Sequence, residues 1–144
     1  MSIRSAALTL FLSAVLAAPA LAQSGVTEPP KLSIELNATQ DVDGACRLTF
    51  VARNGTGTPI GRAVFETVIF DTSGGVERLS LFDFRDLPAD RPRVRQFDLP
   101  RISCDAIGQT LINGANTCLV DGSESDVCDA MLSLSSRIPV ELLG

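Results

Sequence analysis

Four cysteines are the residues of this chain whose chemistry is most constrained by their spacing. Cys46, Cys104, Cys118 and Cys128 include no C-x-x-C pair, the spacing of thiol–disulfide oxidoreductases. No His or Lys adjoins them in sequence to lower the pKa of a thiol. Arg47 follows Cys46, but neighbouring side chains on a strand point to opposite faces. The even number of cysteines therefore predicts two structural disulfides, with three pairings possible.

A second chemical feature is the cluster of arginines between residues 85 and 101 of a chain whose net charge is −5. Arginine binds carboxylates and phosphates through a planar fork of donors. One hypothesis is an anion-binding strip, for a partner's carboxylates or lipopolysaccharide phosphates, formed by Arg91, Arg93, Arg95 and Arg101. The alternative is an edge strand that its charges protect from aggregation, with nearby aspartates neutralising them.

Acidic residues offer two further kinds of site. The segment 121–126 (DGSESD) gathers oxygen ligands of the type that Ca²⁺ prefers, but it lacks the spacing of an EF-hand. A solvated loop is the alternative, and we expect no metal site and no cofactor. Paired carboxylates for glycoside hydrolysis are compatible with the spacing of acids, although the chain lacks the Trp and Tyr on which sugars stack.

Missing residue types exclude several functions. The chain contains no His, so a histidine-based catalytic triad and a zinc site with imidazole ligands are impossible. Its acidic balance argues against a nucleic-acid binder, which needs a basic surface. We therefore assign no catalytic residue and expect a protein that is not an enzyme.

The first 22 residues predict the compartment in which the protein works. Arg4 precedes an uncharged apolar run over residues 6–18, Pro19 interrupts it, and Ala20-Leu21-Ala22 is a small-x-small cleavage site. We expect cleavage after Ala22, which makes residues 1–22 a secretory signal peptide. An uncleaved anchor is the alternative, but the strongly apolar part is too short to span a bilayer. The composition is typical of a GC-rich bacterium, so we expect a periplasmic location.

Turn residues and apolar periodicity predict the elements that position these groups. Residues 23–30 are polar and end in two prolines, which predicts a flexible lead to one domain at 31–144. Period-two alternation or short apolar runs predict seven strands, at 31–38, 46–53, 62–71, 76–84, 93–99, 107–112 and 130–143. The 62–71 run is apolar on both faces, as in a central strand.

Three segments have less regular patterns. In 93–99, Phe97 and Leu99 share a face with Arg93 and Arg95, so we expect a late start or a bulge. Residues 115–129 are predicted to be irregular, with a helical turn opening near residue 125. Pro139 in the last strand indicates an edge position or a bulge.

Seven short strands without a long helix predict an all-β fold, an immunoglobulin-like or fibronectin-III-like antiparallel β-sandwich of about seven strands. In a sandwich of this order, strands two and five are antiparallel neighbours, so the start of 46–53 lies beside the end of 93–99. Cys118 and Cys128 flank the connection between strands six and seven. The favoured pairing is therefore Cys46–Cys104 with Cys118–Cys128.

The strand and turn at 64–74 (VFETVIFDTSG) resemble those of small exported β-sandwich domains of the FxLYD type. Ile69, Phe70 and Asp71 match the apolar-aromatic-Asp triplet of that motif, while Thr67 and Phe70 replace its Phe and Tyr. The turn at 54–59 (NGTGTP) is similar to the one that precedes this strand there. The chain also resembles a family of alphaproteobacterial periplasmic proteins, in RLSLFDFRDLP, VRQFDLP and the later cysteines. Both resemblances imply a periplasmic sandwich, and neither supplies a catalytic residue or ligand.

These patterns predict a non-enzymatic periplasmic domain that contacts an envelope protein, through strand addition or side-chain pairing at an exposed edge. The strand near Pro139 and the arginine-bearing strand are the expected contact edges. The alternatives are an anion- or ligand-binding protein that uses the arginines, a structural subunit of an envelope assembly, and a carboxylate-based hydrolase. A hydrolase would need a deep pocket holding two acids with perturbed pKa values. After signal cleavage we expect no membrane insertion and no nucleic-acid partner.

Overall fold

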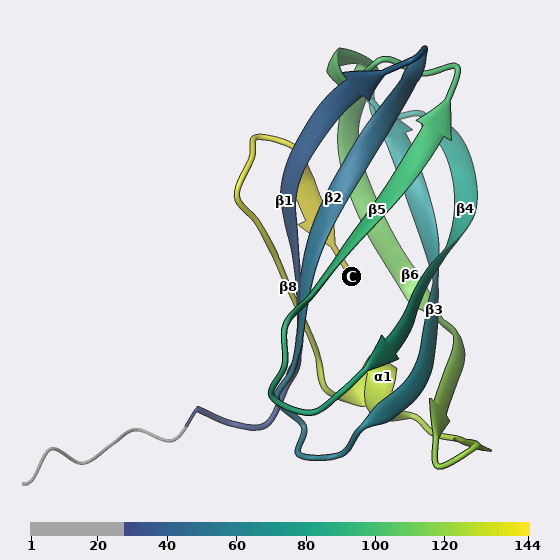
Figure 1. Ribbon diagram of the computed structural model, residues 1–144. Coiled ribbons are helices and arrows are strands. Elements are labelled where there is room, and N and C mark those ends of the chain that lie inside the picture. Colours follow the sequence, from purple (N-terminus) through teal and green to yellow (C-terminus); the bar gives the residue numbers. More distant parts are fainter. Residues whose placement is uncertain (1–27) are drawn as a thin grey trace, which may run out of the picture.

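The computed structural model describes residues 28–144, which form two β-sheets packed face to face (Figure 1). One sheet has the strand order β5-β2-β1-β8 and the other β4-β3-β6-β7, with β9 also paired to β6. The predicted all-β sandwich is confirmed, whereas the predicted signal peptide and the first residues of the lead lie outside the described residues. The strands are β1 (Leu32–Val42), β2 (Ala45–Asn54), β3 (Ile60–Asp71), β4 (Val76–Leu87), β5 (Arg93–Pro100), β6 (Ile107–Val120), β7 (Ser123–Glu124), β8 (Leu132–Ser136) and β9 (Glu141–Leu143).

Both strand placements predicted from the sequence are confirmed, but two pairings differ from a purely antiparallel sandwich. β2 and β5 are antiparallel neighbours, and Cys46 on β2 lies opposite Leu99 near the end of β5. β3 lies between β4 and β6, which confirms its central position. Two pairings are parallel, β1 with β8 and β6 with β9. The sheets are therefore mixed rather than purely antiparallel.

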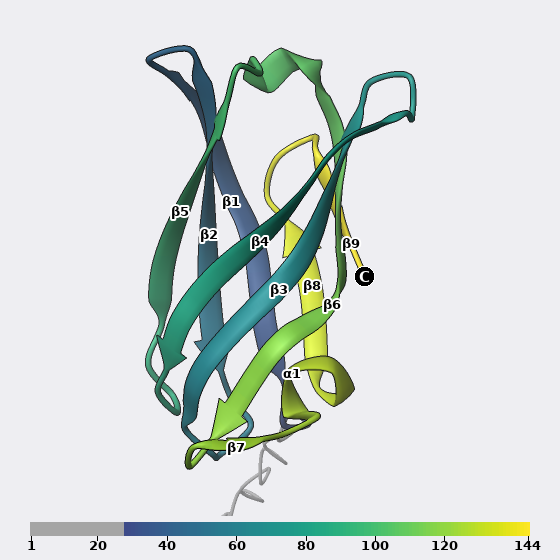
Figure 2. The same cartoon turned by 90° about the vertical axis from the view of Figure 1, so that its right-hand side faces the viewer.

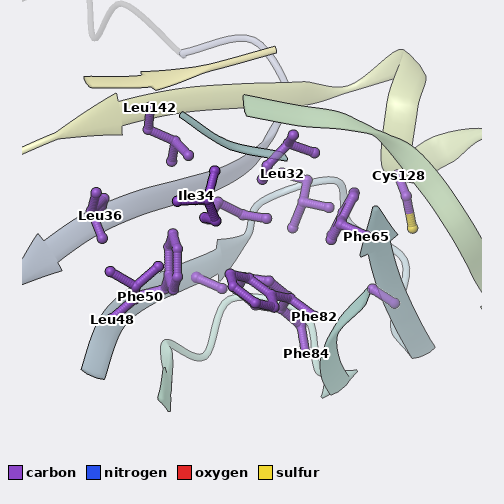
Figure 3. Close-up of a cluster of buried hydrophobic side chains, with 14 of the residues drawn as sticks. Leu32, Ile34, Leu36, Leu48, Phe50, Phe65, Phe82, Phe84, Cys128 and Leu142 are labelled. Carbon is purple, nitrogen blue, oxygen red and sulfur yellow. The ribbon is translucent and has the colours of Figure 1, made fainter. Parts of the chain in front are cut away.

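The hydrophobic core lies between the sheets and is built mostly from alternate residues of the longer strands (Figure 3). An aromatic cluster joins β2, β4 and β5 across it. The ring of Phe50 meets those of Phe82 and Phe84 edge-on, at centroid distances of 5.9 and 5.6 Å. Phe82 on β4 and Phe97 on β5 stack at 4.2 Å. Each buried Phe contributes about 1.5–3 kcal/mol, so this cluster holds together the edge strands of the two sheets.

The prediction of one long strand over residues 130–143 is wrong. β8 pairs with β1 in one sheet, and β9 pairs with β6 in the other. Between them the chain crosses from sheet to sheet, and the Ser136 hydroxyl bonds the carbonyl oxygens of Ile138 and Val140 at 3.0 and 2.6 Å. Pro139 lies in this crossing, where its missing N–H costs no ladder bond. Period two persists because Leu132 and Leu134 of β8 and Leu142 of β9 all face the core.

The segment 115–129, predicted to be irregular, is largely regular. β6 continues through Asn113-Gly114 to Val120, and the register shifts around Gly114, whose φ is 152°. Asn113-Gly114 therefore forms a bulge within β6 rather than a turn that ends the strand. The short helices η1 (Cys104–Ala106) and α1 (Val127–Ala130) follow β5 and β7. The helical turn expected near residue 125 is thus present two residues later.

Candidate functional site

Both disulfides of the favoured pairing are present. Cys46 is bonded to Cys104 over a Cα–Cα distance of 4.9 Å, and Cys118 to Cys128 over 6.0 Å. Among residues 28–144 no cysteine is free. The first bond ties β2 to η1, and the second ties β6 to α1. The cysteines therefore stabilise the fold, and their pairing indicates an oxidising compartment.

The four arginines of the predicted strip lie in different surroundings. Arg93 and Arg95 turn toward the gap between the sheets, where they share the face of Phe97 and Leu99. β5 begins at Arg93 and pairs with β2 without a register shift, so neither the late start nor the bulge expected from the sequence occurs. Both arginines instead have acceptors on β4. Arg95 Nε donates to the carbonyl oxygen of Phe84 at 2.6 Å, and its Nη2 donates to that of Asp86 at 3.1 Å. Arg93 forms an ion pair with the Asp86 carboxylate at 3.3 Å.

The other two arginines of the predicted strip lie far from each other. Arg91 precedes β5 and Arg101 follows it, and both are exposed. The eight residues of β5 between them span roughly 25 Å. One small anion cannot bridge that distance, so the four arginines do not form a single anion-binding site.

The acidic segment 121–126 is mostly a β-hairpin. Asp121 and Gly122 form the two-residue turn between β6 and β7, with φ values of 50° and 75°. Positive φ at both positions defines a type I′ turn, for which Asp-Gly is a strong sequence signal. Within the described range, no three His, Cys, Asp or Glu side chains gather in an arrangement that could hold a metal ion. This Asp-Gly pair is best explained by the fold.

Surface ion pairs lower the pKa values of two carboxyl groups, those of Asp98 and Asp83. The bidentate hydrogen bonds from Arg47, at 2.7 and 2.8 Å, lower the pKa of Asp98. Burial opposes the ionisation of Asp83, but the Arg85 N–H and the Arg62 guanidinium lower its pKa overall. The two aspartates lie on β5 and β4, in different sheets. Each carboxylate is thus part of a local structural pair rather than of a shared acid dyad.

The two outer faces of the sandwich differ in polarity. On the β5-β2-β1-β8 sheet, the outward positions of β1 and β2 are mostly polar, and they include Ser33, Glu35, Arg47 and Thr49. The outward positions of the opposite sheet form an apolar surface that crosses four strands. We call it the outer apolar face, and its residues are Val68, Val76, Leu79, Leu81, Leu111 and Leu143.

Strand register and burial show that the side chains of the outer apolar face lie next to one another on the outside of this sheet. Val68 lies between Leu79 on β4 and Leu111 on β6, and Leu111 lies beside Leu143 on β9. Val68 is 7% exposed yet does not belong to the core cluster, because the surrounding side chains of the outer surface cover it. Figure 2 looks onto this sheet, and no described segment lies over it.

Exposure is concentrated on this face. Of the six exposed large hydrophobic side chains in residues 28–144, four lie here, with 61% exposure at Val76, 57% at Leu79 and Leu81, and 40% at Leu143. The sequence predicts that Leu79 and Leu81 share a face, which the structure confirms. Their exposure was not predicted, because an apolar alternation does not reveal which side of a strand faces the core. The two-sided apolar pattern of 62–71 was the available signal.

Comparison with known proteins gives one structural similarity. No family model matches the chain, and no curated protein matches it. The fold is similar to a solved structure described as the structural characterization of IrmA from Escherichia coli, with a TM-score of 0.61 and 14% sequence identity. The similarity covers 73% of this chain and 91% of that chain. At this level of identity it supports the β-sandwich fold alone.

Within residues 28–144, no helix has both the length and the apolar character needed to cross a bilayer. α1, the described α-helix, has four residues.

Proposed function

We propose that this chain is a non-enzymatic β-sandwich domain that is exported to the periplasm and acts by binding another protein of the cell envelope. The outer apolar face is the observation that carries the proposal. Contiguous apolar surface on a soluble domain is characteristic of interaction sites. The two disulfides support an oxidising compartment, and the predicted signal peptide supports export.

The outer apolar face is favoured over the two edges expected from the sequence. The arginine-bearing edge uses Arg93 and Arg95 in contacts with β4. The C-terminal edge is divided between two sheets at Pro139, so it offers no long strand for addition. The face, by contrast, is held by three long strands, β4, β3 and β6, so its leucines are positioned before a partner arrives.

Site-specific photo-cross-linking in the native host tests this proposal. A photoreactive phenylalanine analogue replaces Leu81 on the outer apolar face, and in a matched variant it replaces Thr49 on the polar face. We expect one dominant protein adduct from position 81 and none from position 49. The absence of an adduct from both positions, or equal adducts from both, would contradict a binding role for this face.

A further inference from the structure

We infer that the partner presents apolar side chains bordered by lysine or arginine, and that Glu66 and Glu141 select for that charge. The inference rests on the proposed function, because it specifies the chemistry that the outer apolar face would recognise. It arises from the distribution of charge over this face rather than from its apolar residues alone.

Two carboxylates lie among the residues of the outer apolar face or at its border. Glu66 lies on β3 directly opposite Leu81 of β4 and two positions from Val68. Glu141 lies on β9 two positions from Leu143, beside Gln109 of β6. They are therefore on the same surface as the exposed leucines, one within it and one at its border.

Neither carboxylate is neutralised by the described part of the chain. Glu66 Oε1 accepts a hydrogen bond from Asn113 Nδ2 at 2.6 Å, and Glu141 Oε2 accepts one from Gln109 Nε2 at 3.0 Å. An amide orients a carboxylate without cancelling its charge. Among residues 28–144, no arginine or lysine is within ion-pair distance of either one.

Asp83, a third carboxylate on this face, differs from Glu66 and Glu141 because it has a cationic partner. Asp83 forms an ion pair with Arg62 at 3.0 Å, so the fold supplies its counter-charge. Glu66 and Glu141 are left with unbalanced negative charge next to apolar surface. A partner that buried this surface without a cation would desolvate them unpaired, which is costly.

This charge distribution distinguishes among the possible occupants. A second copy docked by two-fold symmetry would bring the same face against this one, so it would add two more unpaired glutamates to the interface, where like charges are unfavourable. An anionic lipid surface would repel the patch and attract a basic one instead. A protein segment with apolar residues between basic ones would cover the leucines and supply a counter-charge to the two glutamates.

The chain contains a matched control for Glu66. On the opposite, polar face, Glu35 of β1 accepts a hydrogen bond from Asn37 Nδ2 at 2.9 Å. Glu35 and Glu66 are thus both partly exposed strand glutamates held by an asparagine amide. Substitution of either one changes the net charge of the protein equally, but only Glu66 belongs to the outer apolar face.

The experiment repeats the cross-link from position 81 in the full chain, in the native host, with Glu66→Lys, Glu141→Lys, Glu66→Gln and Glu35→Lys. Tandem mass spectrometry identifies the cross-linked segment of the captured protein. We expect a segment with lysine or arginine beside apolar residues, and an adduct yield that falls about tenfold in Glu66→Lys and Glu141→Lys. Glu66→Gln should lower the yield less, and Glu35→Lys should not change it. Melting curves of the purified variants check that each one folds.

The outcomes separate this inference from the proposed function. An adduct whose yield is equal in Glu66→Lys and Glu35→Lys, or a cross-linked segment without basic residues, overturns the charge selection while the binding role stands. An adduct with this chain itself, or with lipid, also overturns the inference. The absence of any protein adduct from position 81 overturns both.

Discussion

Arg95 on β5 donates a hydrogen bond from Nε to the carbonyl oxygen of Phe84 on β4, at a distance of 2.6 Å. The two residues belong to the edge strands of different sheets. Phe84 is fully buried, and it belongs to β4, which pairs with β3 on one side and with no described strand on the other. Arg95 therefore satisfies a backbone acceptor at the open edge and links the sheets where the core would otherwise meet water.

Replacement of Arg95 by lysine should destabilise the domain. Lysine keeps the charge but cannot form the fork that reaches the carbonyl oxygens of both Phe84 and Asp86. We expect the free energy of unfolding in urea to fall by about 1–2 kcal/mol. Arg91→Lys, at an exposed position, is the control and should change it by less than about 0.5 kcal/mol. Equal effects of the two substitutions would mean that the Arg95 bonds add nothing to stability.

Asn54 should be among the most sensitive polar positions. Its side chain is 1% exposed, and Nδ2 donates to the carbonyl oxygens of Thr58 and Leu87 at 2.8 and 2.7 Å. Asn54→Ala leaves two acceptors without a donor, which should lower the free energy of unfolding by about 2–3 kcal/mol. Asn54→Asp should cost more, since a carboxylate would face those oxygens. Asn113→Ala on the surface is the control, and a loss as large there would contradict the role assigned to burial.

The two disulfides should contribute unequally to stability. The Cys46–Cys104 bond spans 58 residues and the Cys118–Cys128 bond spans 10. The loop-entropy relation gives about 4 kcal/mol for the longer loop and about 2.7 kcal/mol for the shorter. Urea unfolding of the two double-alanine variants should follow that order. The reverse order would show that packing around the sulfur atoms outweighs the constraint on the unfolded chain.

The turn after β3 should contribute to acid sensitivity. The Ser73 hydroxyl, at 2.6 Å, and then the Gly75 N–H, at 2.9 Å, bond Asp71 Oδ1 and lower the pKa of this carboxyl. A lowered pKa in the folded state adds stability above the unfolded value of about 3.9, and that stability disappears as the pH falls through the folded value. Asp71→Asn, whose amide oxygen can accept the same bonds, should therefore lose less stability than the wild type between pH 5 and pH 2.

NMR titration of Asp71 gives an independent check of this cause. Removal of the Ser73 hydroxyl in Ser73→Ala takes away the largest contribution to the shift, so the pKa of Asp71 should rise toward its usual value. An unchanged titration midpoint in Ser73→Ala would assign the lowered pKa to the backbone N–H groups instead.

The fold class and most strand positions could be predicted from the sequence, and the disulfide pairing that it favoured is the one present. Alternation such as Leu32, Ile34 and Leu36 against polar neighbours is a local property of a strand that buries one face. The Cys46–Cys104 pairing followed from strand order, since strands two and five of such a sandwich are neighbours. These features are predictable because they depend on the periodicity of apolar residues and on the order of the strands, which are both properties of the sequence.

The point where the last strand divides and the contacts of the arginines could not be predicted from the sequence. Residues 130–143 keep period two throughout, but β8 and β9 join different sheets, and an alternating pattern does not identify the neighbouring strand. Arg93 and Arg95 interrupt an apolar face in the sequence. Their acceptors, Phe84 and Asp86, belong to another strand that comes alongside only in the folded molecule.

The outer apolar face depended on the tertiary structure for the same reason. Leu79 and Leu81 lie on one face of β4 and Phe82 and Phe84 on the other, so both faces of this strand are apolar. The sequence determined that both sides of this sheet are hydrophobic, while the packing of the second sheet determined which side it covers. The aromatic side, Phe82 and Phe84, meets Phe50 in the core. The leucines lie at the surface because, within residues 28–144, a second layer packs against one side of the sheet only.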